Sequence, residues 1–262
     1  ISSSESFFAN TRNLIIAEAG SKIDILETFV SMDSANNEKL FTNHVSEIVV
    51  QENAQVSYCK IQAEEGNTAQ INTCQVHQKK GSLFNNYTFS LSGEFVRNNL
   101  NIVLDDQNCE AHLFGLYLPR KGEHIDNHTL VDHRKPNCFS NELYKGIMSD
   151  ASTGVFNGKI FVRQDAQKTN AFQSNRNMLL GDEASVNTKP QLEIYADDVK
   201  CSHGTSTGRM DEEAMFYLRS RGLSEQSAKN LLMQAFAEEV VNAIRFEPLK
   251  AYIVSLIDNR FA

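Results

Sequence analysis

Long apolar runs and basic patches are both scarce in this chain of 262 residues. No run approaches the roughly 18 apolar residues that a membrane-spanning helix needs, so we expect no membrane association. Acids outnumber bases by 33 to 25, which gives a formal net charge of −8. Because such a surface repels phosphate backbones, and no basic stretch with interleaved aromatics occurs, we expect no nucleic-acid binding.

Paired cysteines are also missing. The cysteines are odd in number and widely spaced, and no C-x-x-C pair occurs among Cys59, Cys74, Cys109, Cys138 and Cys201. This pattern argues against both a disulfide framework and a self-contained zinc or cluster site. Free thiols favour a reducing compartment, so we expect a cytoplasmic protein in which most of the cysteines are small buried residues.

Nucleotide and hydrolase motifs are absent as well. The sequence contains no Gly-rich phosphate loop, no G-x-S-x-G elbow and no H-E-x-x-H helix. We therefore expect that the chain does not hydrolyse ATP and is not an enzyme.

What the chain does contain, from about residue 12 to residue 200, is a series of short β-like runs. In most of them Val, Ile, Phe and Thr alternate with polar residues, which is the period of half-buried strands. The expected strands are Leu14–Ala17, Lys22–Val30, Phe41–Val50, Gln55–Gln62, Ala69–His77, Asn86–Ser92, Leu100–Leu104, Ala111–Leu118, His128–His133, Gly154–Arg163 and Gln191–Ala196.

This spacing fits a sandwich, a barrel or a β-solenoid. Two weak features favour the solenoid. Hairpin dipeptides are scarce, with Asn157-Gly158 as the example. Asn is abundant at the ends of the runs, where it tolerates left-handed backbone and can stack between coils.

The period changes to that of helices near residue 208. Asp211 is expected to cap a helix from Glu212 to Ser220 that Gly222 ends, and Ser224 to cap a longer one. Pro248 suits the first turn of a third helix. We expect a β core over residues 1–208 and a small helical subdomain over residues 209–262.

Cys201 and His203 are the first candidates for chemistry. They lie two positions apart after Asp197 and Asp198, so in an extended segment they project from the same face. A thiol beside an imidazole suits iron, sulfide or zinc. The alternative is a buried thiol beside a structural histidine.

A second candidate cluster is His124, Asp126 and His128, with Asp132 and His133 close behind. On a strand the first three would line one face and could form a zinc or iron site. We favour a solvated or hydrogen-bonded face.

Two long stretches resemble the SufB/SufD family of iron–sulfur cluster assembly scaffolds. Residues Gln164–Gly222 are similar to the C-terminal core of the family, and the sequences KCSHG and FYLRSRG within them are typical of its SufD branch. Residues Asp126–Ser152 also match, and the resemblance covers at least residues 85–245. It implies a right-handed parallel β-helix, a single-stranded solenoid, followed by a small α-helical subdomain.

The resemblance also implies function and partners. It predicts a non-catalytic scaffold of the SUF system that forms a heterodimer with SufB through the region Lys189–His203. When isolated, the chain is expected to form a homodimer through the same surface. No cofactor is expected to bind stably. His203 and Cys201 are then candidate transient ligands of iron or an iron–sulfur cluster, shared with SufB, and Arg221, Asp197 and Asp198 are candidate supporting residues, one of the acids pairing with an arginine.

A separate ATPase, SufC, is expected to dock on the terminal helix through Leu249, Tyr252, Ile253 and Leu256. These residues could instead pack against the preceding helix. Two rival functions stay open. One is a purely structural subunit that never contacts iron. The other is a β-helix enzyme acting on acidic polysaccharides, with carboxylates from Asp105-Asp106 and Asp197-Asp198.

Overall fold

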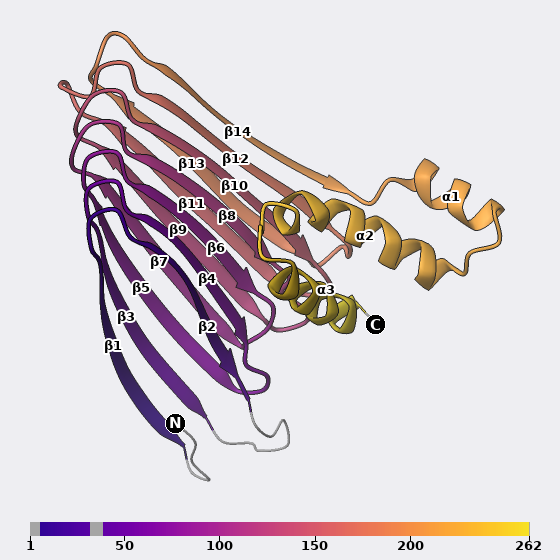
Figure 1. Cartoon of the computed structure of the whole chain (residues 1–262). Coiled ribbons are helices and arrows are strands. Elements are labelled where there is room, and N and C mark those ends of the chain that lie inside the picture. Colours follow the sequence, from indigo (N-terminus) through magenta and orange to yellow (C-terminus); the bar gives the residue numbers. More distant parts are fainter. Residues whose placement is uncertain (1–5, 32–38, 262) are drawn as a thin grey trace.

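The protein is a parallel β-solenoid followed by helices. The computed structural model describes residues 6–31 and 39–261, and within them fourteen strands precede three helices (Figure 1). Successive strands alternate between two seven-stranded sheets, and every strand pairs in parallel with the strand two places along the chain. Each coil therefore consists of one strand from each sheet, which confirms the predicted solenoid.

The odd-numbered strands form the first sheet and the even-numbered strands the second. The first sheet contains β1 (Phe7–Ala17), β3 (Leu40–Val50), β5 (Thr68–Gln78), β7 (Phe95–Leu104), β9 (His124–His133), β11 (Thr153–Val162) and β13 (Ser185–Ile194). The second contains β2 (Lys22–Val30), β4 (Gln55–Ala63), β6 (Leu83–Ser90), β8 (Glu110–Tyr117), β10 (Phe139–Met148), β12 (Asn170–Leu179) and β14 (Lys200–Arg209).

Three strands lie outside the runs expected from the sequence: β10, β12 and β14. In each of them polar residues interrupt the apolar inner face that identifies the other strands, although β10 also places Tyr144 and Met148 in the core. The inward positions of β12 include Gln173, Asn175 and Asn177, all of them buried. β10 buries Glu142 in the same way. Residues with amide or carboxylate side chains are typical of loops, so a sequence rich in them does not suggest a strand. In a solenoid, however, they can stack in register on the residues of the next coil.

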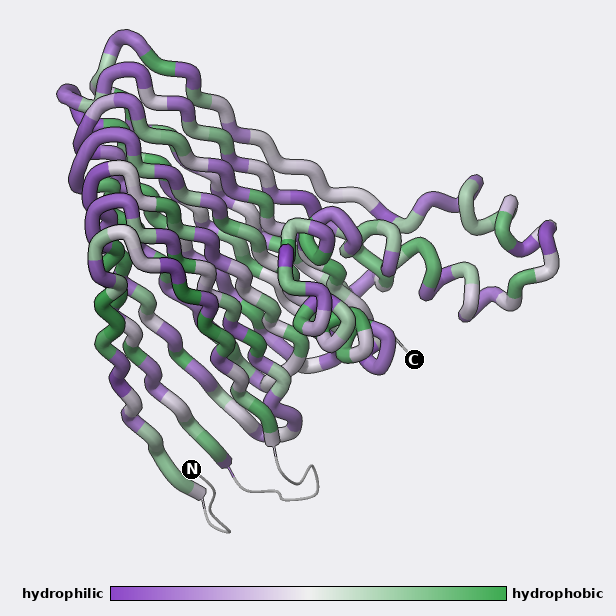
Figure 2. Tube along the Cα trace, viewed as in Figure 1, coloured by the Kyte–Doolittle hydropathy of each residue, from purple (hydrophilic) through white to green (hydrophobic). Residues whose placement is uncertain are grey.

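The main core fills the space between the two sheets. Its side chains come from alternate positions of successive coils and include Ile48, Phe84, Ile102 and Phe156, all fully buried. Apolar residues are concentrated along the strands, and many of the turns at one edge are hydrophilic (Figure 2). Burial of these stacked side chains supplies the main stabilisation of the coils.

The corner between the two sheets repeats from coil to coil. Asn53, Asn108 and Asn137 each have a φ near +59°, and Gly20 and Gly81 have the same left-handed backbone. The N–H at each of these positions donates to a carbonyl in the turn of the next coil, at 2.9–3.3 Å. The expected role of Asn at the ends of the runs is thereby confirmed for these three residues.

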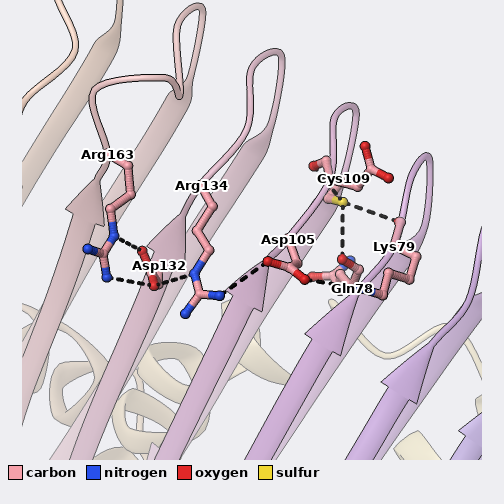
Figure 3. A network of polar contacts seen from close by, with 8 residues as sticks. Gln78, Lys79, Asp105, Cys109, Asp132, Arg134 and Arg163 are labelled. Atoms are coloured by element: carbon pink, nitrogen blue, oxygen red, sulfur yellow. Dashed lines mark hydrogen bonds and ion pairs between the residues drawn. The ribbon is translucent and has the colours of Figure 1, made fainter.

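Alternating charges run along the same corner (Figure 3). Asp105 accepts from Lys79 at 3.0 Å and from Arg134 at 3.2 Å. Asp132 accepts from Arg134 and from Arg163, each at 2.9 Å. These ion pairs link four consecutive coils.

The helices are α1 (Glu212–Ser220), α2 (Glu225–Val241) and α3 (Glu247–Phe261). Asp211 caps α1 by accepting from the backbone N–H of Glu213 and Ala214, and Ser224 caps α2 by accepting from that of Ser227, as the sequence predicts. Among the described residues, no helix has the length and apolar content to cross a membrane.

α2 and α3 lie on the outer face of the second sheet, whereas α1 projects beyond the end of β14 (Figure 1). A second apolar cluster joins these two helices to the sheet. It includes Ile61, Phe89 and Leu116 from the strands, Met233 and Val240 from α2, and Ile253 and Ile257 from α3. Tyr87 also donates to the carbonyl of Ala243, at 3.0 Å.

Candidate functional site

The last coil of the solenoid carries the motif residues. β13 and β14 end the strand orders of their sheets, with β11 and β12 as their respective neighbours. Cys201 pairs in register with Ala171, and His203 with Gln173. Both of these β12 residues are buried. Cys201 and His203 therefore lie on the inner face of β14, at the open end of the coil stack.

The two residues differ in environment although they share a face. Cys201 is half-buried against an apolar cluster that contains Ile160, Ala171 and Ala196. This burial raises the pKa of the Cys201 thiol above its usual value, which favours the protonated form. His203 is exposed. The imidazole is thus accessible to a partner, and the thiol is partly sequestered.

The opposite wall of the last coil comes from β13. The hydroxyl groups of Thr188 and Thr205 lie 3.1 Å apart, so the inner faces of β13 and β14 meet across the open end. We use the name terminal coil for the surface formed by the edges of β13 and β14 together with the inner face of β14. Its β14 face is largely polar, and apolar packing in this coil is concentrated around Cys201, Leu192 and Val199.

A buried acid lies one coil deeper, and the sequence interpretation missed it. Gln173, the register neighbour of His203, donates to Glu142 at 2.7 Å. Burial raises the pKa of Glu142 to about 7. Gly158 makes room for this pair, because a Cβ there would lie 2.4 Å from the Gln173 amide nitrogen. Glu142 and Gln173 both occupy inward-facing positions of their strands. The alternation along β10 and β12 would have indicated this pair if the two strands had been identified from the sequence.

The structure does not bring the candidate supporting residues together. Asp197 and Asp198 lie in the corner before β14, where Asp198 contacts the neighbouring turn through its backbone. Arg221 lies beyond the other end of β14 and stacks on Tyr217, with 5.2 Å between the guanidinium and the ring centroid. Arg219 pairs with Glu225 at 3.6 Å. Neither arginine is therefore positioned against these acids within the chain.

The residues expected to dock the ATPase are divided between inside and outside. Ile253 is fully buried against the second sheet, and Leu249 and Leu256 are half-buried in the same cluster. Tyr252 is 41% exposed, and its neighbour Val254 is 39% exposed. Tyr252 and Val254 thus lie on either side of the buried Ile253, and both are open to a partner.

The cluster around Asp126 is an ion-pair network on the outer face of β9. Asp126 accepts from Arg97 and contacts the His128 Nε2, each at 2.9 Å. Burial and the nearby guanidinium lower the pKa of His128, against the opposing effect of Asp126. His124 instead stacks on Phe95, with ring centroids 5.4 Å apart. Within the described part of the chain, no group of three or more His, Cys, Asp or Glu side chains is arranged to hold a metal.

Among the carboxylates considered for polysaccharide chemistry, Asp105 is already engaged in ion pairs with Lys79 and Arg134. Hydrogen bonds from Lys79 and Arg134 lower the pKa of Asp105 despite the opposing effect of burial. Asp105 is therefore held as an anion in the row of ion pairs along the corner, which we call the corner ladder. A general acid must instead carry a proton.

Comparison with known proteins points in one direction. The family model described as "SUF system FeS cluster assembly, SufBD core domain" matches residues 1–236. The iron–sulfur cluster assembly protein SufD of Escherichia coli is 38% identical over 252 residues, which is 96% of this chain and 59% of that protein.

Two further relatives show the same pattern. A SufBD family protein of Synechocystis is 34% identical over 95% of this chain and 56% of its own length. The chloroplastic protein ABCI7 of Arabidopsis thaliana is 33% identical over 89% of this chain and 49% of its own length. The chain thus spans about half the length of the curated relatives that it matches.

Proposed function

The chain belongs to the SufB/SufD family of iron–sulfur cluster assembly proteins, and we propose that it acts as a non-catalytic scaffold subunit of the SUF complex. In this role it pairs with SufB, docks the SufC ATPase and helps a nascent cluster to form where it meets SufB. The observation that carries the proposal is the terminal coil, which presents Cys201 and His203 at the open end of the solenoid.

Pairing with SufB follows from the strand edges. An edge strand offers unpaired backbone N–H and C=O groups, which favour addition of a further strand. β13 and β14 end their sheets together, and the exposed side chains of β14 are small or polar. A second solenoid can therefore stack on this end. In the absence of SufB, a second copy of this chain is expected to use the same surface and form a homodimer.

Iron or cluster contact follows from the chemistry of His203. A neutral imidazole is a good ligand for iron, and a thiol can join it after losing its proton. One histidine and one cysteine cannot complete a four-ligand site, so the remaining ligands must come from SufB and the site is transient. His203 is the stronger candidate, because Cys201 is partly buried in an apolar cluster.

A purely structural role is the second candidate, and the position of Cys201 favours it. The thiol packs against Ile160 and Ala171, and burial raises its pKa, which are the properties of a packing residue. In that case the terminal coil would contact SufB without binding iron.

Charge placed on the terminal coil tests the pairing. Thr205→Lys with Thr207→Lys adds two cations to the inner face of β14, where both side chains are exposed. We expect loss of co-purification with SufB and loss of the homodimer in sedimentation, with unchanged circular dichroism. Thr28→Lys, on the exposed β2 at the opposite end of the stack, is the matched control. Unchanged pairing of the double variant would overturn this part of the proposal.

A further inference from the structure

Two cysteines stack on one another in the corner before β8 and β10. Cys109 lies in the fourth coil and Cys138 in the fifth, each one residue before its strand. The first residues of these strands, Glu110 and Phe139, are register partners, and the N–H of Phe139 donates to the carbonyl of Cys109 at 2.9 Å. Neighbouring strands lie about 4.8 Å apart, within the range of Cα separations found across disulfides.

The two sulfur atoms converge on one oxygen. The carbonyl of Asp106 accepts from Cys109 Sγ at 3.1 Å and from Cys138 Sγ at 3.2 Å. Cys109 Sγ also lies 3.2 Å from the carbonyl of Lys79 (Figure 3). Both sulfurs are therefore held on the same side of one short turn.

The thiols also influence one another. A hydrogen bond with Cys138 lowers the pKa of Cys109, and the same contact together with burial raises the pKa of Cys138. Of the two coupled thiols, Cys109 is therefore the one with the lowered pKa. Thiolates are the reactive form in disulfide chemistry.

The other cysteines of the β core lack such a neighbour. Cys59 stands in register with Leu26 and Tyr87, and Cys74 with Ser46 and Leu100. Burial raises the pKa of Cys59 and of Cys74 to about 12. These two thiols provide an internal comparison, because they are free and largely enclosed but have no thiol in register.

We propose that Cys109 and Cys138 are an oxidisable dithiol that ties the fourth coil to the fifth. The Cys109 thiolate attacks a two-electron oxidant, such as a diazene or a small disulfide, and forms a mixed adduct. The Cys138 sulfur then attacks Cys109 Sγ and the reduced reagent leaves. The two thiol protons and two electrons pass to the reagent, and one S–S bond forms.

This reaction requires local opening, because both side chains are about 1% exposed. Because of this burial, oxidation is expected to be slower than modification of the half-buried Cys201. The resulting cross-link closes a loop of about 30 residues and constrains the unfolded chain. Oxidation therefore makes the middle of the solenoid more resistant to heat. This inference does not depend on the proposed function.

Oxidation of the folded protein with diamide, followed by peptide mass spectrometry without reduction, tests the proposal. Cys201→Ser serves as the starting protein, so that intermolecular products do not interfere. We expect one linkage, Cys109–Cys138, that dithiothreitol reverses and that raises Tm by about 5 °C. Cys59→Ser should keep both the linkage and the rise in Tm, and Cys109→Ser should lose both.

Absence of the Cys109–Cys138 linkage in the folded protein would overturn the proposal, as would a linkage that forms only in urea. If Cys109→Ser does not fold, the linkage and the rise in Tm in the Cys201→Ser protein still decide the question.

Discussion

At the scale of single residues, the corner positions show how strictly the solenoid selects backbone conformation. Gly or Asn occupies the left-handed position of most coils, but Lys168 adopts the same conformation with a φ of 59°. Its N–H donates to the carbonyl of Asp198, which fixes the backbone there. A long side chain tolerates this conformation less well than Asn does.

Lys168→Asn should therefore stabilise the protein by about 0.5–1 kcal/mol, measured as the free energy of unfolding in urea. Lys135→Asn, in the corresponding turn of the previous coil but at a residue without a positive φ, should leave stability within about 0.5 kcal/mol of the parent. A loss of stability in Lys168→Asn would show that the lysine side chain contributes more than its backbone conformation costs.

The buried Glu142 gives a pH dependence with a defined sign. Its pKa is raised to about 7 by burial, above the 4.5 of an unperturbed carboxyl group. The folded state therefore binds the proton more tightly than the unfolded state, and stability from this group falls as pH rises from about 4.5 to 7. Below about pH 4.5 both states are protonated, so this contribution is fully present and no longer changes with pH.

Glu142→Gln keeps an acceptor for Gln173 but removes the ionisation. It should be more stable than the parent at pH 8, by up to about 3 kcal/mol, and close to it at pH 4. The exposed Glu94→Gln is the control, with no such difference between the two pH values. A difference between parent and Glu142→Gln that does not change with pH would contradict the raised pKa.

At the scale of elements, the sequence predicted the strands in which apolar and polar residues alternate and the helices that begin with a capping residue. The residue pattern predicted the strands with an apolar face, such as β3 and β11, and the start of α1 after Asp211. The family resemblance predicted the parallel arrangement of the strands. β12 and β14 were not, because their inward residues are polar and find partners only in the adjacent coil. Stacking in register is a long-range property that a local pattern does not reveal.

The same limit applies to the candidate site. The spacing of Cys201 and His203 placed them on one face, as the structure has them. Their different burial, and the Glu142–Gln173 pair one coil below, depend on which residues of β10 and β12 lie in register. Likewise, the position of Ile253 against the second sheet depends on how α3 packs, which sequence periodicity alone did not fix.

The packing of α3 separates a docking role from a folding role. Tyr252→Asp places a charge on the exposed face, so SufC should no longer co-purify while the thermal unfolding of the chain is unchanged. Ile253→Asp instead buries a charge in the cluster between helices and sheet and should destabilise the helical subdomain by several kcal/mol.

Retention of SufC by Tyr252→Asp would contradict docking through this face of α3. Asn259→Asp, at another exposed position of the same helix, controls for a general effect of added negative charge.

At the scale of the whole molecule, the middle coils are supported by neighbouring elements, whereas the coil that carries Cys201 and His203 ends both sheets. The corner ladder of Lys79, Asp105 and Arg134 and the two helices on the second sheet stabilise the middle coils. The terminal coil has no such covering within the described residues. The proposed role as a scaffold between two subunits requires this division between a supported body and an uncovered end coil.

Anaerobic reconstitution with SufB and SufC, with iron and sulfide measured per complex, is the most direct test of His203 as a ligand at that end. His203→Ala should leave folding, complex formation and ATP hydrolysis unchanged but lose most of the cluster. His203→Cys should recover part of it, because a thiolate also binds iron. Ser202→Ala, on the outer face of the same strand, should behave as the parent. Cluster formation by His203→Ala at the parental rate would contradict the ligand role and leave this chain as a structural subunit.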